Sequence, residues 1–334
     1  MNNFERRRAI LLGVQAAARI HTEFKLNKHL EHRSASSIDV FRLITEHDIF
    51  LLFKPLKNLL GGAMRDSGQV GILVSTNRSL HIQRFTAAHE LGHIVLNHEV
   101  SLDNEIGQRG QFGTRNDPQE LAADAFASEL LAPKWLIKWH CARHKWTSDS
   151  LSSPVTTYQL SLRLGMSYEA TCWALQSHRI LTPATAERLR SNEPKRIKAL
   201  VLENHHLENS WANAWWLNPA DTGLHFEGGP NDVFRVSVKE HAGSGYLWNF
   251  SSDLHPMNDK RLRLDSNCIG GSVDRDVWFA AIAGETVLVG QESRPFDKAD
   301  VIQKLHVRLS LHTLKTGLPR HQRPQTTDET GYDA

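Results

Sequence analysis

Two histidines and a glutamate in one short segment have the spacing of a metal-binding helix. The segment Arg84–His98 reads RFTAAHELGHIVLNH, so His89 and His93 stand four residues apart and Glu90 lies between them. Positions four apart share one helix face, so both imidazoles can reach one metal ion. Glu90 projects beside them, where it can take a proton from a metal-bound water. Zinc lowers the pKa of such a water from ~15.7 to ~7, so the pattern predicts peptide-bond hydrolysis.

The flanking residues favour a helix that crosses a core. Thr86 stands where an N-cap is expected, and an apolar flank follows, which consists of Leu91, Ile94, Val95 and Leu96. The alternative is a solvated face of a histidine-rich chain, which has 19 His in 334 residues. The apolar flank favours the metal site over this alternative.

A catalytic zinc site usually has three protein ligands and one open position, so a third ligand is needed. Glu99 follows His93 by six residues, but Leu96 occupies the bend where that arrangement needs glycine. Residues 117–133 offer a better helix, with Asp117 as N-cap and proline at the first helical position. Glu120 and Asp124 share a face of this helix. Glu120 can bind zinc while Asp124 accepts a hydrogen bond from a ligating histidine. The alternative is that both are solvated positions on an Ala-rich helix.

These residues resemble a known family. Arg84–His93 and the pattern Glu120-x-x-Ala123-Asp124-x-Phe126-Ala127-x-x-Leu130-Leu131-x-Pro133 resemble the ImmA/IrrE family of zinc metallopeptidases, over roughly residues 35–200. Asp124 stands where that family often has Asn, and it keeps a hydrogen-bond acceptor there.

The resemblance implies that His89, His93 and Glu120 bind one Zn²⁺ per chain and that Glu90 is the general base. It also implies limited proteolysis, in the cytoplasm, of a regulatory protein such as a transcriptional repressor. The role would lie in transcription regulation and the stress response.

Composition indicates a globular chain in a reducing compartment. Hydrophobic residues make up 40% and charged residues 23%. The three cysteines (Cys141, Cys172 and Cys268) have neither metal nor redox spacing. Residues 1–24 place Arg6-Arg7-Arg8 before a short apolar run. We interpret this segment as an amphipathic helix rather than an export signal. No stretch approaches the ~18 apolar residues of a membrane span, so we expect no membrane contact.

A basic segment follows the predicted metal site. Residues 134–200 contain eleven Lys or Arg and four Asp or Glu, a formal charge of +7, while the rest of the chain carries −5. Within it, residues 159–170 predict a helix, a turn at Gly165 and a second helix, which resembles a helix-turn-helix. Two interpretations remain open, namely DNA contact through residues 134–200 and a packing module with a solvated basic face.

Beyond Leu200 the periodicity becomes that of strands. Phe234, Val236 and Val238 alternate with polar residues, and Leu305–Leu311 does the same. This predicts an antiparallel immunoglobulin-like sandwich over about residues 211–314. The polar tail after Thr316, which contains Pro319 and Pro324, is expected to be disordered.

Three loops of this region, with residues Gly243–Trp248, Gly270-Gly271 and Arg294-Pro295-Phe296, resemble in order and spacing the chagasin family of cysteine-protease inhibitors. That resemblance covers about residues 215–314 and implies that the loops lie at one end of the sandwich and bind a partner. The residues singled out are Gly245, Tyr246, Trp248, Gly270, Gly271, Arg294, Pro295 and Phe296. The alternative is that the aromatic residues among them belong to the core.

Together these observations predict an α+β chain. Residues 1–145 form a zincin-like metallopeptidase domain, 146–205 a helical extension, 206–318 the sandwich and 319–334 a disordered tail. The substrate is expected to add to a strand at residues 70–74. Tyr158, His98 and His140 are candidate donors to the transition state. The other functions considered are a DNA-binding regulator with a structural zinc site, and a cysteine-protease inhibitor.

Overall fold

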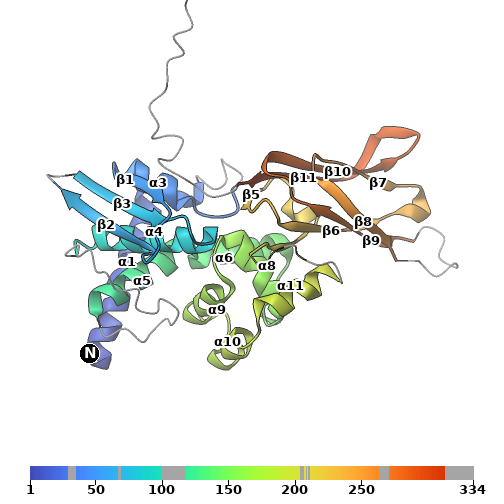
Figure 1. The fold of residues 1–334 in the computed structure, drawn as a ribbon. Helices are drawn as coiled ribbons and strands as arrows, with labels where there is room; N and C mark the ends of the chain where they lie inside the picture. The colour runs from blue at the N-terminus through green and yellow to red at the C-terminus, as the bar shows by residue number, and fades with distance from the viewer. Residues whose placement is uncertain are drawn as a thin grey trace, which may run out of the picture.

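The structure is a computed structural model and describes residues 1–28, 35–66, 69–98, 117–203, 207, 209, 211–262 and 271–312. Figure 1 shows a small sheet with helices at one end of the molecule, further helices in the middle and two stacked sheets at the other end. The order of elements, helices first and strands last, is the predicted α+β arrangement. Within the described ranges, no helix has the length and apolar character needed to cross a membrane.

The first sheet has the strand order β1-β3-β2. Its strands are β1 (Phe50–Lys54), β2 (Gly61–Asp66) and β3 (Gln69–Ser75). β3 pairs in parallel with β1 and antiparallel with β2, so it is the central strand. The prediction that a substrate adds to residues 70–74 is therefore wrong, because both edges of β3 already carry backbone hydrogen bonds. The available edges belong to β1 and β2.

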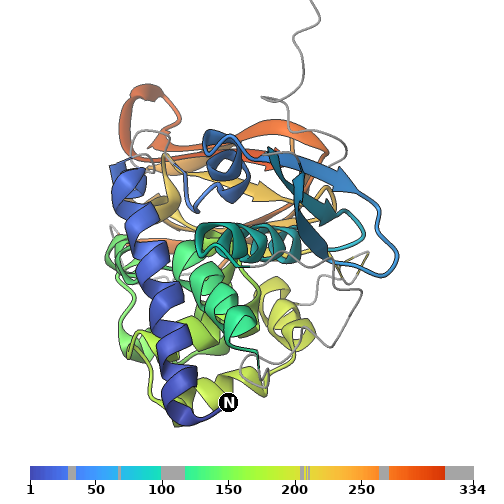
Figure 2. The same ribbon diagram turned by 90° about the vertical axis from the view of Figure 1, so that its left-hand side faces the viewer.

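Four helices belong to this part of the molecule, and they are α1 (Asn3–Glu23), α3 (Val40–Glu46), α4 (Leu80–Val95) and α5 (Pro118–Leu131). α4 packs against β2 and β3, and α5 lies between α4 and α1 (Figure 2). α1 is held at its start by a capping box formed by Asn2 and Glu5. Its buried stripe consists of Ala9, Gly13, Ala16, Ala17 and Ile20. Small side chains in this stripe let α1 approach α5 closely.

The middle of the chain is helical, as predicted. It contains α6 (Lys134–His144), α7 (Ser148–Leu151), α8 (Pro154–Leu164), α9 (Tyr168–Ser177), α10 (Pro183–Arg190) and α11 (Pro194–Leu202). Between α8 and α9, Gly165 takes a positive φ of 66° and Ser167 caps α9. The helix, glycine turn and helix predicted at residues 159–170 are thus present.

The strand region forms two four-stranded sheets, β5-β11-β10-β7 and β4-β6-β9-β8. The strands are β4 (Ala214–Leu217), β5 (His225–Gly228), β6 (Val233–Glu240), β7 (Leu247–Ser251), β8 (His255–Arg261), β9 (Val273–Ala280), β10 (Gly284–Arg294) and β11 (Asp297–Leu311). The short helices η1 (Pro219–Asp221) and η2 (Ala242–Ser244) lie in its loops. The sandwich is not wholly antiparallel, because β4 joins β6 and β5 joins β11 in parallel.

The sandwich has its own core and also contributes to the other one. The sandwich core contains buried Trp215, Phe226 and Trp248. Ala214, Val233 and Trp278 instead belong to the larger core of the helical part. The two halves therefore share a packed boundary. Cys141 and Cys172 are free thiols, and Cys268 lies outside the described residues, as does the predicted tail 319–334.

Candidate metal centre

The helix α4 carries the two histidines in its interior. It begins at Leu80, with Ser79 at the N-cap position, although the Ser79 side chain contacts His81 Nε2 at 3.1 Å instead of capping. Thr86, predicted as the N-cap, lies well inside the helix and is only 2% exposed. The prediction failed because no proline or glycine interrupts residues 80–86, so the helix extends past the polar residue. His89 and His93 are therefore fixed by several turns of helix on the N-terminal side.

Three side chains converge as predicted. One nitrogen each from His89 and His93 and one carboxylate oxygen from Glu120 lie within 4.8 Å of one another. Glu120 Oε1 is 3.2 Å from His93 Nε2, and Glu120 Oε2 is 3.5 Å from His89 Nε2. The third ligand comes from α5, which begins as predicted at Pro118 after the N-cap Asp117. Among the residues that the structure describes, this is the group with metal-binding geometry.

The outer partners of the histidines determine where their lone pairs point. Asp124 Oδ1 is 2.8 Å from His89 Nδ1, so that nitrogen donates and Nε2 keeps its lone pair. His98 Nδ1 is likewise 3.0 Å from His93 Nδ1. The two inner nitrogens, His89 Nε2 and His93 Nε2, face each other at 3.0 Å. Two lone pairs this close repel unless a cation or a shared proton lies between them, so the donor set fits a divalent metal ion.

The electrostatics favour positive charge at the same place. Burial lowers the pKa of His89, but hydrogen bonds to Asp124 and Glu120 outweigh burial and raise it to about 9. Burial opposes ionisation of Glu120, but its hydrogen bonds to both histidines hold its pKa well below the ordinary range. A field that stabilises a proton on His89 also stabilises a cation that replaces the proton. Two nitrogens and one carboxylate are a ligand set that zinc accepts.

Glu90, the predicted general base, is 6% exposed and follows His89 directly in α4. Tyr158 and His140 are not near the metal group. The Tyr158 hydroxyl donates to Asn213 Oδ1 and accepts from the Ala214 amide, at the boundary with the sandwich. His140 is fully buried, and its Nε2 lies 2.8 Å from the Ser36 carbonyl oxygen. Of the three candidate donors only His98 lies beside the histidines, and it contacts the outer nitrogen of His93.

The loops at the end of the sandwich only partly match the prediction. The Gly243 amide donates to the Gly271 carbonyl, and the Arg294 guanidinium lies 4.6 Å from the Tyr246 ring centre, so the three loops do meet. Phe296 is 82% exposed and Pro295 is also exposed.

Trp248 is a core residue at 2% exposure, stacks on Phe250, and donates from Nε1 to the Lys239 carbonyl. It cannot bind a partner, because its ring fills the sandwich interior. Gly245 adopts a positive φ of 79° in the first loop, whereas Gly270 lies outside the described residues.

Two arginines of the basic segment are occupied by internal contacts. Arg163 is fully buried and forms a bidentate pair with Asp221, at 3.0 and 2.8 Å. Arg190 stacks on the Trp173 ring at 3.6 Å. The second helix of the pair, α9, buries Tyr168, Ala170, Thr171, Cys172, Ala174 and Leu175. These contacts show that the helices pack as a module, while Lys134, Lys138, Arg188 and Lys195 are exposed. DNA contact therefore stays a prediction.

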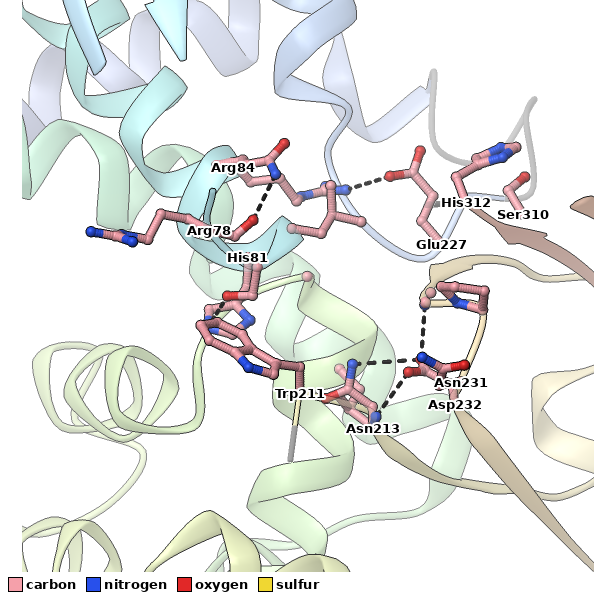
Figure 3. A pocket seen from close by; sticks show the side chains of 18 of the residues that line it. Arg78, His81, Arg84, Trp211, Asn213, Glu227, Asn231, Asp232, Ser310 and His312 are labelled. Atoms are coloured by element: carbon pink, nitrogen blue, oxygen red, sulfur yellow. Dashed lines mark hydrogen bonds and ion pairs between the residues drawn. The ribbon is translucent and has the colours of Figure 1, made fainter. Parts of the chain in front are cut away.

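A separate cavity of about 500 Å³ lies at the boundary between the helical part and the sandwich (Figure 3). Arg78, His81 and Arg84 line it from the start of α4, and Glu227 and Asp232 line it from the sandwich. Arg84 donates to Glu227 at 3.1 Å across this boundary. The cavity contains none of the metal-binding residues, although it shares α4 with them. No local pattern indicates this cavity, because its walls come from segments far apart in the chain.

A comparison with protein families matches the part of the chain that carries the candidate metal centre. Residues 44–176 match the peptidase family described as the IrrE N-terminal-like domain, which covers about two fifths of the chain. The matched region contains α4 and α5, so all the residues of the candidate metal centre lie within it. A comparison with curated proteins gives no match.

Three solved structures are similar to the C-terminal region, outside the part that matches the peptidase family. The cysteine protease inhibitor EhICP2 from Entamoeba histolytica is 18% identical, with a TM-score of 0.27, and the match covers 30% of this chain and 97% of that one. Amebosin is 13% identical, with a TM-score of 0.26, and the match covers 30% of this chain and 98% of that one. PbICP-C, in complex with falcipain-2, is 14% identical, with a TM-score of 0.20, and the match covers 32% of this chain and 95% of that one. The assignment of a sandwich follows from the strand order of its two sheets and not from these similarities.

Proposed function

We propose that this chain is a zinc-dependent endopeptidase that performs limited proteolysis of a regulatory protein, such as a transcriptional repressor. The observation that carries the proposal is the pair of inner imidazole nitrogens 3.0 Å apart, with the Glu120 carboxylate beside them. The IrrE N-terminal-like domain supports a peptidase. The identity of the metal as zinc and the class of substrate are both proposed here.

Each residue of the centre has a separate task. His89, His93 and Glu120 would hold the metal ion. Zinc bound there would lower the pKa of a water molecule to about 7 and would polarise the scissile carbonyl. Glu90 would accept a proton from the attacking water and could pass it to the leaving amine. Asp124 keeps His89 protonated at Nδ1 and thus oriented.

The substrate would bind in extended form along β2. This strand is an edge of the first sheet, and α4 packs against it. Arg65 of β2 donates to Asn97 Oδ1 at 3.0 Å, just after the end of α4. β2 therefore lies beside the turn that follows His93, and an added strand would run past the metal centre.

The sandwich would bind a protein partner through its three end loops, the last of which carries the exposed Phe296. In Figure 1 the β10–β11 hairpin lies at the end of the sandwich away from the β1–β3 sheet. A role in docking a substrate or partner is therefore favoured over a role in covering the metal centre. The test is cleavage by Phe296→Ala, which should lower turnover of the physiological protein and leave a short peptide unaffected.

The alternative, a regulator with a structural zinc site, needs a fourth protein ligand. The group formed by the described residues has three members, the number typical of catalytic sites. This count favours the enzyme.

Replacement of Glu90 by Gln tests the proposal. Glu90→Gln should keep one zinc per chain, since Glu90 is not a ligand, and should lose turnover by at least the roughly 10²–10⁴-fold that general base catalysis contributes. Zinc is measured by elemental analysis and turnover by product formation from proteins of cell extracts. Glu187→Gln, an exposed glutamate on α10, is the matched control and should behave as the unaltered chain. Full turnover in Glu90→Gln, or loss of its zinc, would refute the proposal.

A further inference from the structure

The turn after α4 folds the chain back over the metal-binding helix. The Leu96 amide donates to the Gly92 carbonyl, and the His98 amide donates to the His93 carbonyl, both at 2.9 Å. Asn97, between them, has a positive φ of 56°. Asn adopts this left-handed conformation more readily than most residues, so it is well suited to end a helix here. The residue that follows is thereby directed back toward the last turn of α4.

That residue is His98, and it meets a metal ligand. The two Nδ1 atoms of His98 and His93 are 3.0 Å apart, and the rings are 5.1 Å apart, edge to face. One of the two nitrogens must carry the hydrogen. His93 Nε2 faces His89 and Glu120, so a metal there needs the Nε2 lone pair and His93 carries its hydrogen on Nδ1. His98 Nδ1 is then the acceptor, and His98 has its own hydrogen on Nε2.

The turn is held from outside the helix. Arg65 of β2 donates to Asn97 Oδ1 at 3.0 Å and to the Ile94 carbonyl at 3.4 Å. The guanidinium thus links the edge strand to the last turn of α4 and to the residue with positive φ. His98 is in this way positioned by the strand along which substrate is expected to bind.

We propose that His98 is a positioning residue that fixes the tautomer and the ring orientation of His93. The inference rests on the proposed function, because it needs a metal at His93. The two ligating histidines then differ in their partners. His89 donates to a carboxylate, Asp124, whereas His93 donates to a neutral imidazole.

Two substitutions separate hydrogen bonding from packing. In His98→Asn, the side-chain oxygen occupies nearly the position of Nδ1 and can accept the same hydrogen bond. In His98→Leu, a branched side chain of similar width fills the space without an acceptor. Zinc affinity is measured by competition with a chelating dye at pH 7.5, and the thermal midpoint verifies that each variant is folded. His306→Leu, an exposed histidine on β11, is the matched control.

His98→Leu should bind zinc about 10–100-fold more weakly, as losses of an outer partner do. His98→Asn and the control should bind as the unaltered chain does. Two-bond ¹H–¹⁵N spectra of the zinc-loaded chain should show His93 protonated at Nδ1, and His98→Leu should broaden or shift that signal. Equal affinity in all variants, or equal loss in the Asn and Leu variants, overturns the inference and leaves the peptidase intact. An unaltered chain that binds no zinc overturns both.

Discussion

The arrangement of the two inner nitrogens of His89 and His93 favours a cation between them. Their lone pairs face each other because the outer nitrogens are occupied by Asp124 and His98. Glu120 adds negative charge from a second helix. Ligand geometry at this centre is therefore set by the outer hydrogen bonds as well as by the motif.

Asp124 is expected to matter as an acceptor rather than as a charge. Asp124→Ala should weaken zinc binding about 10–100-fold, because His89 loses the partner that orients it. Asp124→Asn should keep most of the affinity, since its amide oxygen still accepts from His89 Nδ1. Competition with a chelating dye measures both. Equal affinity for the Ala variant and the unaltered chain would show that the 2.8 Å contact does not orient the ligand.

The helices α4 and α5 position the ligands, and α1 supports them from outside. Phe126 of α5 lies against Gly92 of α4, where an added Cβ would be 3.0 Å from the phenyl ring. On the other side, a Cβ at Gly13 of α1 would lie 2.1 Å from the Ala122 carbonyl oxygen. The spacing of the three helices thus depends on two glycines.

The substitution Gly13→Ala has two opposite effects on the free energy of unfolding. Helix propensity favours Ala by roughly 1 kcal/mol. The collision with the α5 backbone costs about 1–3 kcal/mol or more, since backbone cannot rotate away. We expect a lower thermal midpoint and a weaker zinc site, because α5 carries Glu120. Gln15→Ala, at an exposed position of α1, is the control. A raised midpoint in Gly13→Ala would mean that α1 moves aside freely.

The halves of the molecule are joined by buried polar contacts. Asp221 and Arg163 are both fully buried, and His144 Nε2 also contacts Asp221 at 3.1 Å. The Gln159 side chain donates to the Ala214 carbonyl and accepts from the Trp216 amide. This boundary argues against a sandwich that folds alone, because separating the halves would leave Arg163 without its partner. The exact domain limits stay a prediction.

Asp221→Ala should therefore destabilise the whole molecule. Loss of one partner of a buried pair costs about 3–5 kcal/mol, because the other charge stays buried. Calorimetry should show one cooperative transition that moves to lower temperature as a unit. Glu285→Ala, which removes an exposed carboxylate paired with His312, should change little. Two separate transitions, of which only one moves, would restore the independent sandwich.

Acid should weaken the fold below about pH 6.5. Burial lowers the pKa of His140 to about 3, against the ordinary 6.5, even though its contact with the Ser36 carbonyl raises it. The folded state then binds fewer protons than the unfolded state, so stability is complete above pH 6.5 and falls as the pH drops toward 3. Between pH 6.5 and 5.5 one such group costs about 1.4 kcal/mol at most.

Urea unfolding at pH 7.5 and 5.5 checks this, and His140→Gln should show a smaller difference between the two. Its amide nitrogen can still donate to the Ser36 carbonyl oxygen, and it does not titrate. An equal difference in both proteins would assign the acid sensitivity to other groups, such as His81, whose pKa burial lowers to about 4.

Local patterns predicted the convergence of His89, His93 and Glu120, the limits of α5, and strands β6 and β11. A four-residue spacing fixes a helix face, and period-two alternation fixes a strand face, whatever the rest of the chain does. Thr86 shows where this fails, because a polar residue can cap a helix or lie buried inside it, and only packing decides.

Tertiary structure alone decided the rest. It made β3 a central strand, buried Trp248, brought His98 to His93, and joined Arg84 to Glu227 across a boundary cavity. Each of these depends on which distant segments are neighbours, and side-chain spacing within one element carries no information about that.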